Sequence, residues 1–159
     1  MIPIPKNCPC SSQQLYQSCC QPLHNGKLTA SSAQQLMCSR YSAFCLGKID
    51  YLMNTLLPEK RQADDEQILG ETIKQTQWLG LKIIKHSQQR QTASVEFVAF
   101  YKDNPIGQLH ERSRFIKHNG RWFYIDSEIL NPIKLSRNEL CFCGSGKKVK
   151  KCHDDATTK

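Results

Sequence analysis

The sequence predicts an α+β fold: a cone-shaped domain in which three N-terminal helices pack on a curved antiparallel sheet, with a small cysteine-containing motif at each terminus. Three observations predict it. Apolar residues recur with a helical period from about residue 31 to 77, and the period changes to two from about 78 to 130. A cysteine pattern occurs once before this region and once after it.

The helical region has recognisable start and stop residues. Ser31 or Ser32 can cap a first helix that runs to about residue 46 and stops at Gly47. A second, short helix is expected at 50–57, and a third after Asp64-Asp65 that ends near residue 77. The residues expected to face inward are Leu36, Met37, Tyr41, Phe44 and Cys45 in the first helix and Ile68, Leu69 and Ile73 in the third.

Four segments then alternate between apolar and polar residues, as half-buried strands do. They span 78–86, 94–102, 108–117 and 121–130. Asn119-Gly120 lies between the last two segments, and this dipeptide favours a two-residue hairpin turn. Consecutive strands joined in this way predict an antiparallel sheet.

The cysteine pattern at the two ends repeats with a constant offset. The first set reads C-x-C-x8-C-C and the second C-x-C-x8-C-H, and each member precedes its counterpart by 133 residues. Two close pairs of soft ligands suit tetrahedral Zn2+, and a complete set of four indicates a structural rather than a catalytic site. We therefore expect two Zn2+ per chain. The expected ligands are Cys8, Cys10, Cys19 and Cys20 in the first set and Cys141, Cys143, Cys152 and His153 in the second.

The two sets differ in the turn between their ligand pairs. The second carries Gly144-Ser145-Gly146, whose glycines allow a tight reversal, whereas the first carries Ser11-Ser12-Gln13. His24 follows Cys20 by four residues and is an alternative fourth ligand of the first set.

These residues also carry a family resemblance. Arg137-Asn138 followed by C-F-C-G-S-G-K-K-V-K-K-C-H resembles the SEC-C motif, named for the zinc-binding C-terminal tail of the bacterial preprotein translocase ATPase. From C-P-C-S-S-Q-Q-L-Y-Q-S-C-C-Q-P-L-H-N-G through L-M-C-S-R-Y-S-A-F to L-H-E-R-S-R-F, the chain is similar to the bacterial YchJ family. The resemblance implies SEC-C motifs at 1–27 and 134–159 that flank a nuclear transport factor 2-like (NTF2-like) domain at 28–133. Phe142 and Val149 replace a common proline and a common aromatic residue, and neither position is a ligand.

Composition excludes a membrane span and a secreted scaffold. No apolar run approaches the length that a membrane helix needs, and the start M-I-P-I-P-K-N-C is unlike a signal peptide. The nine cysteines are therefore expected as reduced thiols in the cytoplasm. Cys38 and Cys45, outside the two sets, are interpreted as small core residues rather than a reactive pair.

Positive charge is concentrated at the ends of the chain. Of the net charge of +8, the segment 134–159 carries +4 and the segment 1–30 carries +2. Such ends can meet an anionic partner such as RNA or an acidic protein surface. Alternatively, the lysines Lys147, Lys148, Lys150 and Lys151 only balance the zinc thiolates. Phe142 is the one aromatic candidate there for stacking on a base.

A cone-shaped domain can also enclose a ligand pocket. Alternation in L-H-E-R-S-R-F places Glu111 on the core face, where a carboxylate needs a partner, and Arg40 of the first helix is the expected one. This pair is interpreted as structural. Tyr124 and Asp126 are further candidates for the same pocket, and the histidines His86, His110 and His118 are expected at the surface.

Three classes of function are compatible with the sequence. The first, which we expect, is a zinc-binding, non-enzymatic adaptor whose basic SEC-C ends recognise a protein or ribonucleoprotein partner, with direct nucleic-acid binding possible. The second is small-molecule binding or enzymatic activity in the central cavity, although no nucleophile elbow, phosphate loop or dinucleotide fingerprint is present. The third is a metal-handling or redox role, which the adjacent cysteines Cys19 and Cys20 suggest.

Overall fold

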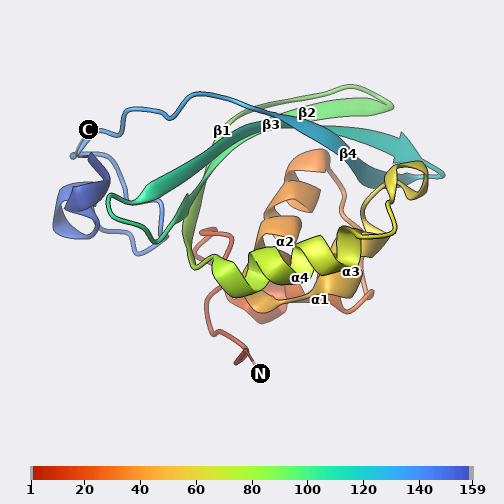
Figure 1. The fold of residues 1–159 in the computed structure, drawn as a ribbon, viewed down its shortest axis with the longest axis horizontal. Coiled ribbons are helices and arrows are strands. Elements are labelled where there is room, and N and C mark those ends of the chain that lie inside the picture. The colour runs from red at the N-terminus through yellow and green to blue at the C-terminus, as the bar shows by residue number, and fades with distance from the viewer. Residues whose placement is uncertain (1, 158–159) are drawn as a thin grey trace.

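The four strands form one antiparallel sheet in the order β1-β2-β3-β4, and the sheet curves over a layer of helices (Figure 1). This arrangement is seen in a computed structural model that describes residues 2–157. The strands are β1 Trp78–Gln88, β2 Thr92–Tyr101, β3 Gly107–His118 and β4 Arg121–Ile129. Their ends lie within two residues of the predicted ends. The α+β fold class is confirmed.

The helices lie on one side of the sheet (Figure 1). They are α1 Gln21–His24, α2 Ala33–Leu46, α3 Ile49–Asn54 and α4 Asp65–Gln75. Short 3-10 turns occupy Tyr16–Ser18 (η1), Pro58–Lys60 (η2), Val149–Lys151 (η3) and Asp154–Thr157 (η4). The helices α2, α3 and α4 are the three predicted ones. The helix α1 was not predicted because its four residues are too few to show a helical period.

The helices α2 and α4 contribute differently to the core. Ser32 caps α2 by accepting a hydrogen bond of 3.1 Å from the backbone N–H of Gln35, and Gly47 ends it in the left-handed conformation at φ 70°. Leu36, Met37 and Tyr41 of the predicted stripe are buried. By contrast α4 has no buried residue, and Ile68, which was expected to face inward, is 50% exposed. The helix α4 therefore covers the core rather than forming part of it.

An irregularity between β3 and β4 decides which face the end of β4 presents. Arg114 pairs with Asp126 and Phe115 with Tyr124, so Ile125 is an extra residue on β4. One extra residue reverses the alternation of side chains beyond it. Asp126 consequently lies on the outer face, where its carboxylate accepts two hydrogen bonds from Arg114. The expectation that Asp126 shares the inner pocket with Tyr124 is wrong for this reason.

The chain beyond β4 returns along the outer face of the sheet (Figure 1). The backbone N–H of Leu130 donates to the carbonyl oxygen of His110 at 2.8 Å. The backbone of Ile133 forms two hydrogen bonds with the side chain of Gln108, at 2.8 and 3.0 Å. We call residues 130–135 the strap, because they hold the C-terminal motif to the sheet.

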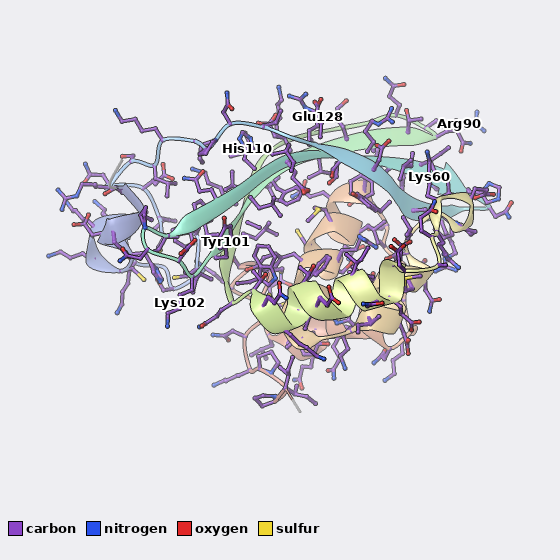
Figure 2. The ribbon with its side chains drawn as sticks, in the orientation of Figure 1. Lys60, Arg90, Tyr101, Lys102, His110 and Glu128 are labelled. Carbon is purple, nitrogen blue, oxygen red and sulfur yellow. The ribbon has the colours of Figure 1, made fainter. Side chains whose placement is uncertain are left out.

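His110 lies beneath the strap rather than at the surface. Its Nδ1 is 2.5 Å from the carbonyl oxygen of Asn131, and its Nε2 is 3.0 Å from Oε2 of Glu96. His110 is only 8% exposed, so the predicted surface position is wrong. His86 and His118 are exposed, as expected. Figure 2 shows His110 and Glu128 on the side of the sheet away from α4.

Apolar side chains are buried on both faces of β2, which divides the core in two. Val95, Phe97 and Ala99 face the helices and belong to the main core around α2. Val98 and Phe100 face the other way and belong to a second cluster, which also contains Leu135, Cys141, Phe142 and Val149 of the C-terminal segment. Within residues 2–157, no helix combines the length and the apolar character that a bilayer crossing requires.

Candidate metal centres

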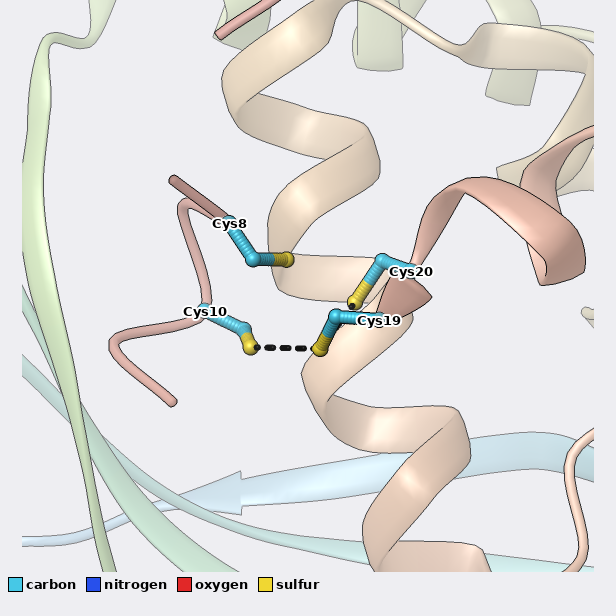
Figure 3. A group of neighbouring side chains, drawn as sticks. All are labelled: Cys8, Cys10, Cys19 and Cys20. Atoms are coloured by element: carbon cyan, nitrogen blue, oxygen red, sulfur yellow. Dashed lines mark hydrogen bonds between the residues drawn. The ribbon is translucent and has the colours of Figure 1, made fainter. Parts of the chain in front are cut away.

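The four cysteines of the N-terminal set converge beside α2 (Figure 3). The Sγ atoms of Cys10 and Cys19 are 3.6 Å apart, and those of Cys19 and Cys20 are 3.9 Å apart. All four Sγ atoms, including that of Cys8, lie within 4.8 Å of one another. These separations are far longer than a disulfide bond of about 2.05 Å. The N-terminal set is thus a group of free thiols that could hold a metal ion.

The fourth sulfur of this group comes from Cys20, and His24 has a different role. The hydroxyl of Ser42 in α2 donates to Sγ of Cys20 at 3.4 Å. His24 already uses both ring nitrogens: Nδ1 is 2.7 Å from the Tyr16 hydroxyl, and Nε2 is 2.8 Å from the carbonyl oxygen of Ser39. Burial lowers the pKa of His24. The geometry therefore favours Cys20 as a ligand and His24 as a link between α1 and α2.

The C-terminal set converges in the same way. The Sγ atoms of Cys143 and Cys152 are 3.5 Å apart, and Sγ of Cys141 is 3.2 Å from Nδ1 of His153. The four ligand atoms lie within 4.8 Å of one another. A second group that could hold a metal ion therefore forms where the sequence predicted it.

The two groups are built on one backbone pattern, repeated 133 residues apart. Each begins with an isolated antiparallel bridge, places a serine hydroxyl near the third ligand, and continues into a 3-10 turn. The matching features are the bridges Asn7–Leu15 and Leu140–Lys148, the hydroxyl contacts Ser12–Cys19 at 3.3 Å and Ser145–Cys152 at 3.5 Å, and the turns η1 and η3. The N-terminal set is therefore a structural copy of the C-terminal motif, although their turn sequences differ.

Left-handed backbone recurs at matching positions of the two turns. Gly144 and Gly146 have φ of 78° and 80°, and their counterparts Ser11 and Gln13 both have φ of 66°. This conformation is unstrained for glycine but costs an L-residue about 1–2 kcal/mol. The two turns therefore have the same backbone conformation although their sequences differ. The N-terminal turn adopts this conformation with non-glycine residues, for which it is unfavourable.

The donors fit a tetrahedral metal ion. A zinc ion with Zn–S bonds of about 2.3 Å separates two thiolates by about 3.8 Å. Three of the sulfur pairs lie 3.5 to 3.9 Å apart, and all ligand atoms of each set lie within 4.8 Å of one another. The thiols of Cys10 and then Cys20 hydrogen-bond to Cys8 and hold its pKa well below the usual value, whereas the pKa values of Cys10 and Cys20 are raised, so the first thiolate of the set forms at Cys8. A metal ion favours the same thiolate form.

The two candidate centres also contact each other across β1. The hydroxyl of Ser11 donates to the carbonyl oxygen of Phe142 at 2.7 Å and accepts from the backbone N–H of Leu81 at 3.2 Å. Gly80 permits this approach, because a Cβ at that position would collide with the carbonyl of Phe142. One hydroxyl thus ties the N-terminal turn, the first strand and the C-terminal motif together.

The expected pair of Arg40 and Glu111 does not form. Nη1 of Arg40 donates to the carbonyl oxygen of Leu52 at 2.8 Å and to the hydroxyl of Thr55 at 2.6 Å, and the guanidinium lies 4.5 Å above the ring of Tyr124. No ion pair among residues 2–157 joins Arg40 to a carboxylate. The acceptors come from Leu52 of α3 and from Thr55, which follows this helix, and the alternation of β3 gives no sign of them.

Cys38 and Cys45 pack against the main core, and Phe142 is buried in the second cluster. Burial raises the pKa of Cys38 and of Cys45 to about 12, which agrees with small core residues rather than reactive thiols. Phe142 is 5% exposed and stacks on Phe100 with ring centroids 3.8 Å apart. Phe142 is therefore an anchor of the C-terminal motif, and its suggested role in base stacking is wrong.

The fold and the paired cysteine motifs define an NTF2-like protein with a SEC-C motif. A family model described as "YchJ, middle NTF2-like domain" matches residues 32–127, and the SEC-C motif model matches residues 137–153. A UPF0225 protein of Actinobacillus succinogenes is 40% identical, with 91% of this chain and 94% of the relative covered. A UPF0225 protein of Serratia proteamaculans is 39% identical, with 94% and 98% covered. The chain belongs to this family, the YchJ or UPF0225 family.

Two solved structures share the fold. The solution structure of a SEC-C motif containing protein from Rhodopseudomonas palustris has a TM-score of 0.73 and 34% identity, and the match covers 79% of this chain and 99% of that chain. The crystal structure of a SEC-C motif containing protein from Psychrobacter arcticus has a TM-score of 0.68 and 31% identity, with 94% and 96% covered.

Proposed function

We propose that this chain is a zinc-binding, non-enzymatic interaction protein of the cytoplasm. It holds two structural Zn2+ ions and recognises a protein or ribonucleoprotein partner through its basic C-terminal motif. Zinc is the usual metal in closed sites that consist of four thiolates, or of three thiolates and one imidazole. Neither set leaves a coordination position for substrate, which supports a structural role for both ions.

One observation carries the interaction role: the C-terminal motif is anchored on one side and cationic on the other. Its apolar side, Phe142 and Val149, is buried in the second cluster. Four lysines are exposed on the motif, namely Lys147, Lys148, Lys150 and Lys151. Charges held on a rigid support can match an anionic surface without a large loss of conformational entropy on binding.

The burial of the N-terminal set argues against a metal-handling or redox role. Cys8, Cys10 and Cys20 are 5%, 6% and 2% exposed. An ion that is handed to a partner, or a thiol that exchanges with a disulfide, needs access to that partner. Buried sulfurs instead suit an ion that remains with the folded chain.

Charge reversal of the four lysines tests the interaction role. Changing Lys147, Lys148, Lys150 and Lys151 together to Glu should abolish capture of the partner in an affinity pull-down, because the anionic surface would then be repelled. The fold should persist, since exposed charges contribute little to stability. Binding of the unmodified protein should weaken steeply between about 50 and 200 mM salt. A nuclease-treated sample distinguishes a protein partner from a ribonucleoprotein.

The matched control reverses the same number of positive charges at positions outside the C-terminal motif. Lys48, Lys60, Lys74 and Lys102 are also exposed but lie on the central domain, so their change to Glu should leave capture intact. If the tail variant and the control variant capture the partner equally well, the C-terminal motif is not the recognition element.

A further inference from the structure

A cavity of about 480 Å3 lies between the sheet and the helices. Its walls come from α2, α4 and the inner face of the sheet, and Figure 2 shows Tyr101 at one end of this space. The volume lies within the range of small-molecule sites, about 300–1,000 Å3. The helix α4 has no buried residue and lines the cavity with Asp65, Ile68, Leu69 and Thr72, so it is the least embedded wall of the cavity.

Aromatic rings form the apolar wall at one end of the cavity. Trp78 is central, with ring centroids 6.0 Å from Tyr41, 6.5 Å from Phe44 and 6.0 Å from Tyr101. All four rings line the cavity. Their arrangement is edge to face, which leaves ring faces and edges available to an apolar or aromatic body.

Arg40 places a positive charge in this largely apolar cavity, and no ion pair among residues 2–157 joins it to a carboxylate. It is 7% exposed, and burial lowers its pKa only to about 10, so the guanidinium is charged at neutral pH. Its Nη1 is satisfied by Leu52 and Thr55. Among residues 2–157, Nε and Nη2 of Arg40 have no hydrogen-bond acceptor. These two atoms are nevertheless not fully enclosed by the protein. These donors therefore retain some accessible surface, and Arg40 is one of the residues that line the cavity.

A buried charge is unfavourable unless a counter-charge and hydrogen bonds accompany it. A carboxylate supplies both to the free edge of a guanidinium, because its two oxygens match two parallel N–H donors. A doubly charged phosphate fits less well, since Arg40 is the only cationic side chain that lines the cavity within the described residues. Glu111 and Asp65 also line it and would repel a dianion more strongly than a monoanion.

We propose that the cavity binds a small apolar monocarboxylate, whose carboxylate group pairs with Arg40 and whose apolar body lies against the aromatic rings around Trp78. Glu111 tunes this site as a like charge, which weakens binding when it is ionised. Burial raises the pKa of Glu111, so its repulsion of a bound carboxylate weakens as the pH falls. This binding activity goes beyond the proposed interaction role and does not depend on the lysines of the tail.

Calorimetric titration of the full metal-loaded chain with 2-naphthoate and with octanoate tests the proposal. At least one of these carboxylates should bind, and the neutral isostere 2-naphthylmethanol should bind at least about tenfold more weakly than 2-naphthoate, because it cannot neutralise the guanidinium. Glu111→Gln should tighten carboxylate binding about tenfold, since it removes the like charge while keeping the shape. The charge-reversed tail variant should bind as the unmodified protein does.

Arg40→Gln should weaken carboxylate binding at least about thirtyfold, provided that circular dichroism shows it folded. Because Arg40 also holds α3, this variant can fail to fold, and the alcohol and Glu111→Gln comparisons then decide. The proposal is overturned if neither carboxylate binds at concentrations up to about 1 mM, the upper end of the usual range of small-molecule affinities. Equal binding of the alcohol, or weaker binding by Glu111→Gln, would overturn it as well.

Discussion

The two cysteine centres share their ligand spacing and backbone but differ in how they are embedded. At the N-terminal centre Cys8, Cys10 and Cys20 are buried and belong to the main core with α2. At the C-terminal centre only Cys141 of the four ligands is buried, and Cys152 is exposed. A ligand pattern therefore specifies the geometry of a centre but not how much of the fold depends on it. The N-terminal centre supports the core, whereas the C-terminal centre is docked onto it.

Removal of one ligand from each centre is the strongest test of this difference. Cys20→Ser should lose one metal ion and lower the free energy of unfolding by about 3–5 kcal/mol, because the ion and the core around α2 are lost together. Its melting temperature should fall by roughly 10 °C. Cys152→Ser should lose one ion as well but change global stability by only about 1 kcal/mol, since only the docked motif loosens. Metal analysis and thermal melts measure both effects, and equal melting temperatures would contradict the comparison.

Loss of the Phe142 anchor should undock the C-terminal motif without emptying it. Phe142→Ala removes the ring that stacks on Phe100 and should cost about 3 kcal/mol of docking free energy. Hydrogen exchange should therefore rise at residues 137–153 while the metal content stays at the unmodified level. Leu140→Ala is the control, because Leu140 lies in the same motif but is 65% exposed. Unchanged exchange in Phe142→Ala would show that other contacts hold the motif.

Acid should release the strap, a device that the N-terminal centre lacks. His110, followed by Arg112, holds the pKa of Glu96 below its usual value, so the ionised carboxylate contributes stability above the ordinary carboxyl pKa. This contribution, about 2 kcal/mol for a buried charge-assisted hydrogen bond, is lost as the pH falls through the lowered pKa. The protection of residues 130–135 against hydrogen exchange should fall on acidification below about pH 4.3, the ordinary pKa of a Glu carboxyl.

Glu96→Gln should abolish this acid response of the strap. Glu128→Gln is its control, because Glu128 pairs with the same Arg112 but its side chain is 60% exposed. If both variants respond to acid as the unmodified protein does, Glu96 does not control the strap.

The smallest effects concern the left-handed turn of the N-terminal centre. Gln13→Gly should stabilise the protein by about 1 kcal/mol, because glycine adopts this conformation without strain. Ser11→Gly relieves the same strain but removes the hydroxyl that joins Leu81 to Phe142, so it should be neutral or destabilising by about 1 kcal/mol. Chemical denaturation of the two variants decides whether strain or the hydroxyl bridge dominates at Ser11.

The sequence predicted the features that rest on local chemistry. Ser32 and Gly47 bound α2 as expected, and Asn119 and Gly120, with φ of 51° and 78°, form the predicted turn. The ligand sets also converge as their spacing indicated. Each of these depends on residues close in the chain, where capping, turn preference and spacing act directly.

The incorrect predictions concern features that depend on tertiary contacts. The extra residue Ile125 leaves no mark in the alternation of β4, so Asp126 was placed on the wrong face. The polar side chain of His110 favours an exposed position, but Asn131 of the strap that covers it lies 21 residues further along the chain. Arg40 was paired with the one buried carboxylate visible in the pattern, whereas backbone and hydroxyl acceptors of α3 were nearer.

The hydroxyl of Ser11 also closes a long loop, because Phe142, which accepts its hydrogen bond, lies 131 residues further along the chain. By comparison, the hydroxyl of Ser42 contacts Cys8 and Cys20 across only 34 and 22 residues. The entropic cost of closing a loop rises slowly with its length, by about 0.6 kcal/mol for each doubling. The four paired strands between Ser11 and Phe142 already bring the two motifs to the same strand. One hydroxyl therefore joins distant parts of the chain at little entropic cost beyond that of forming the sheet.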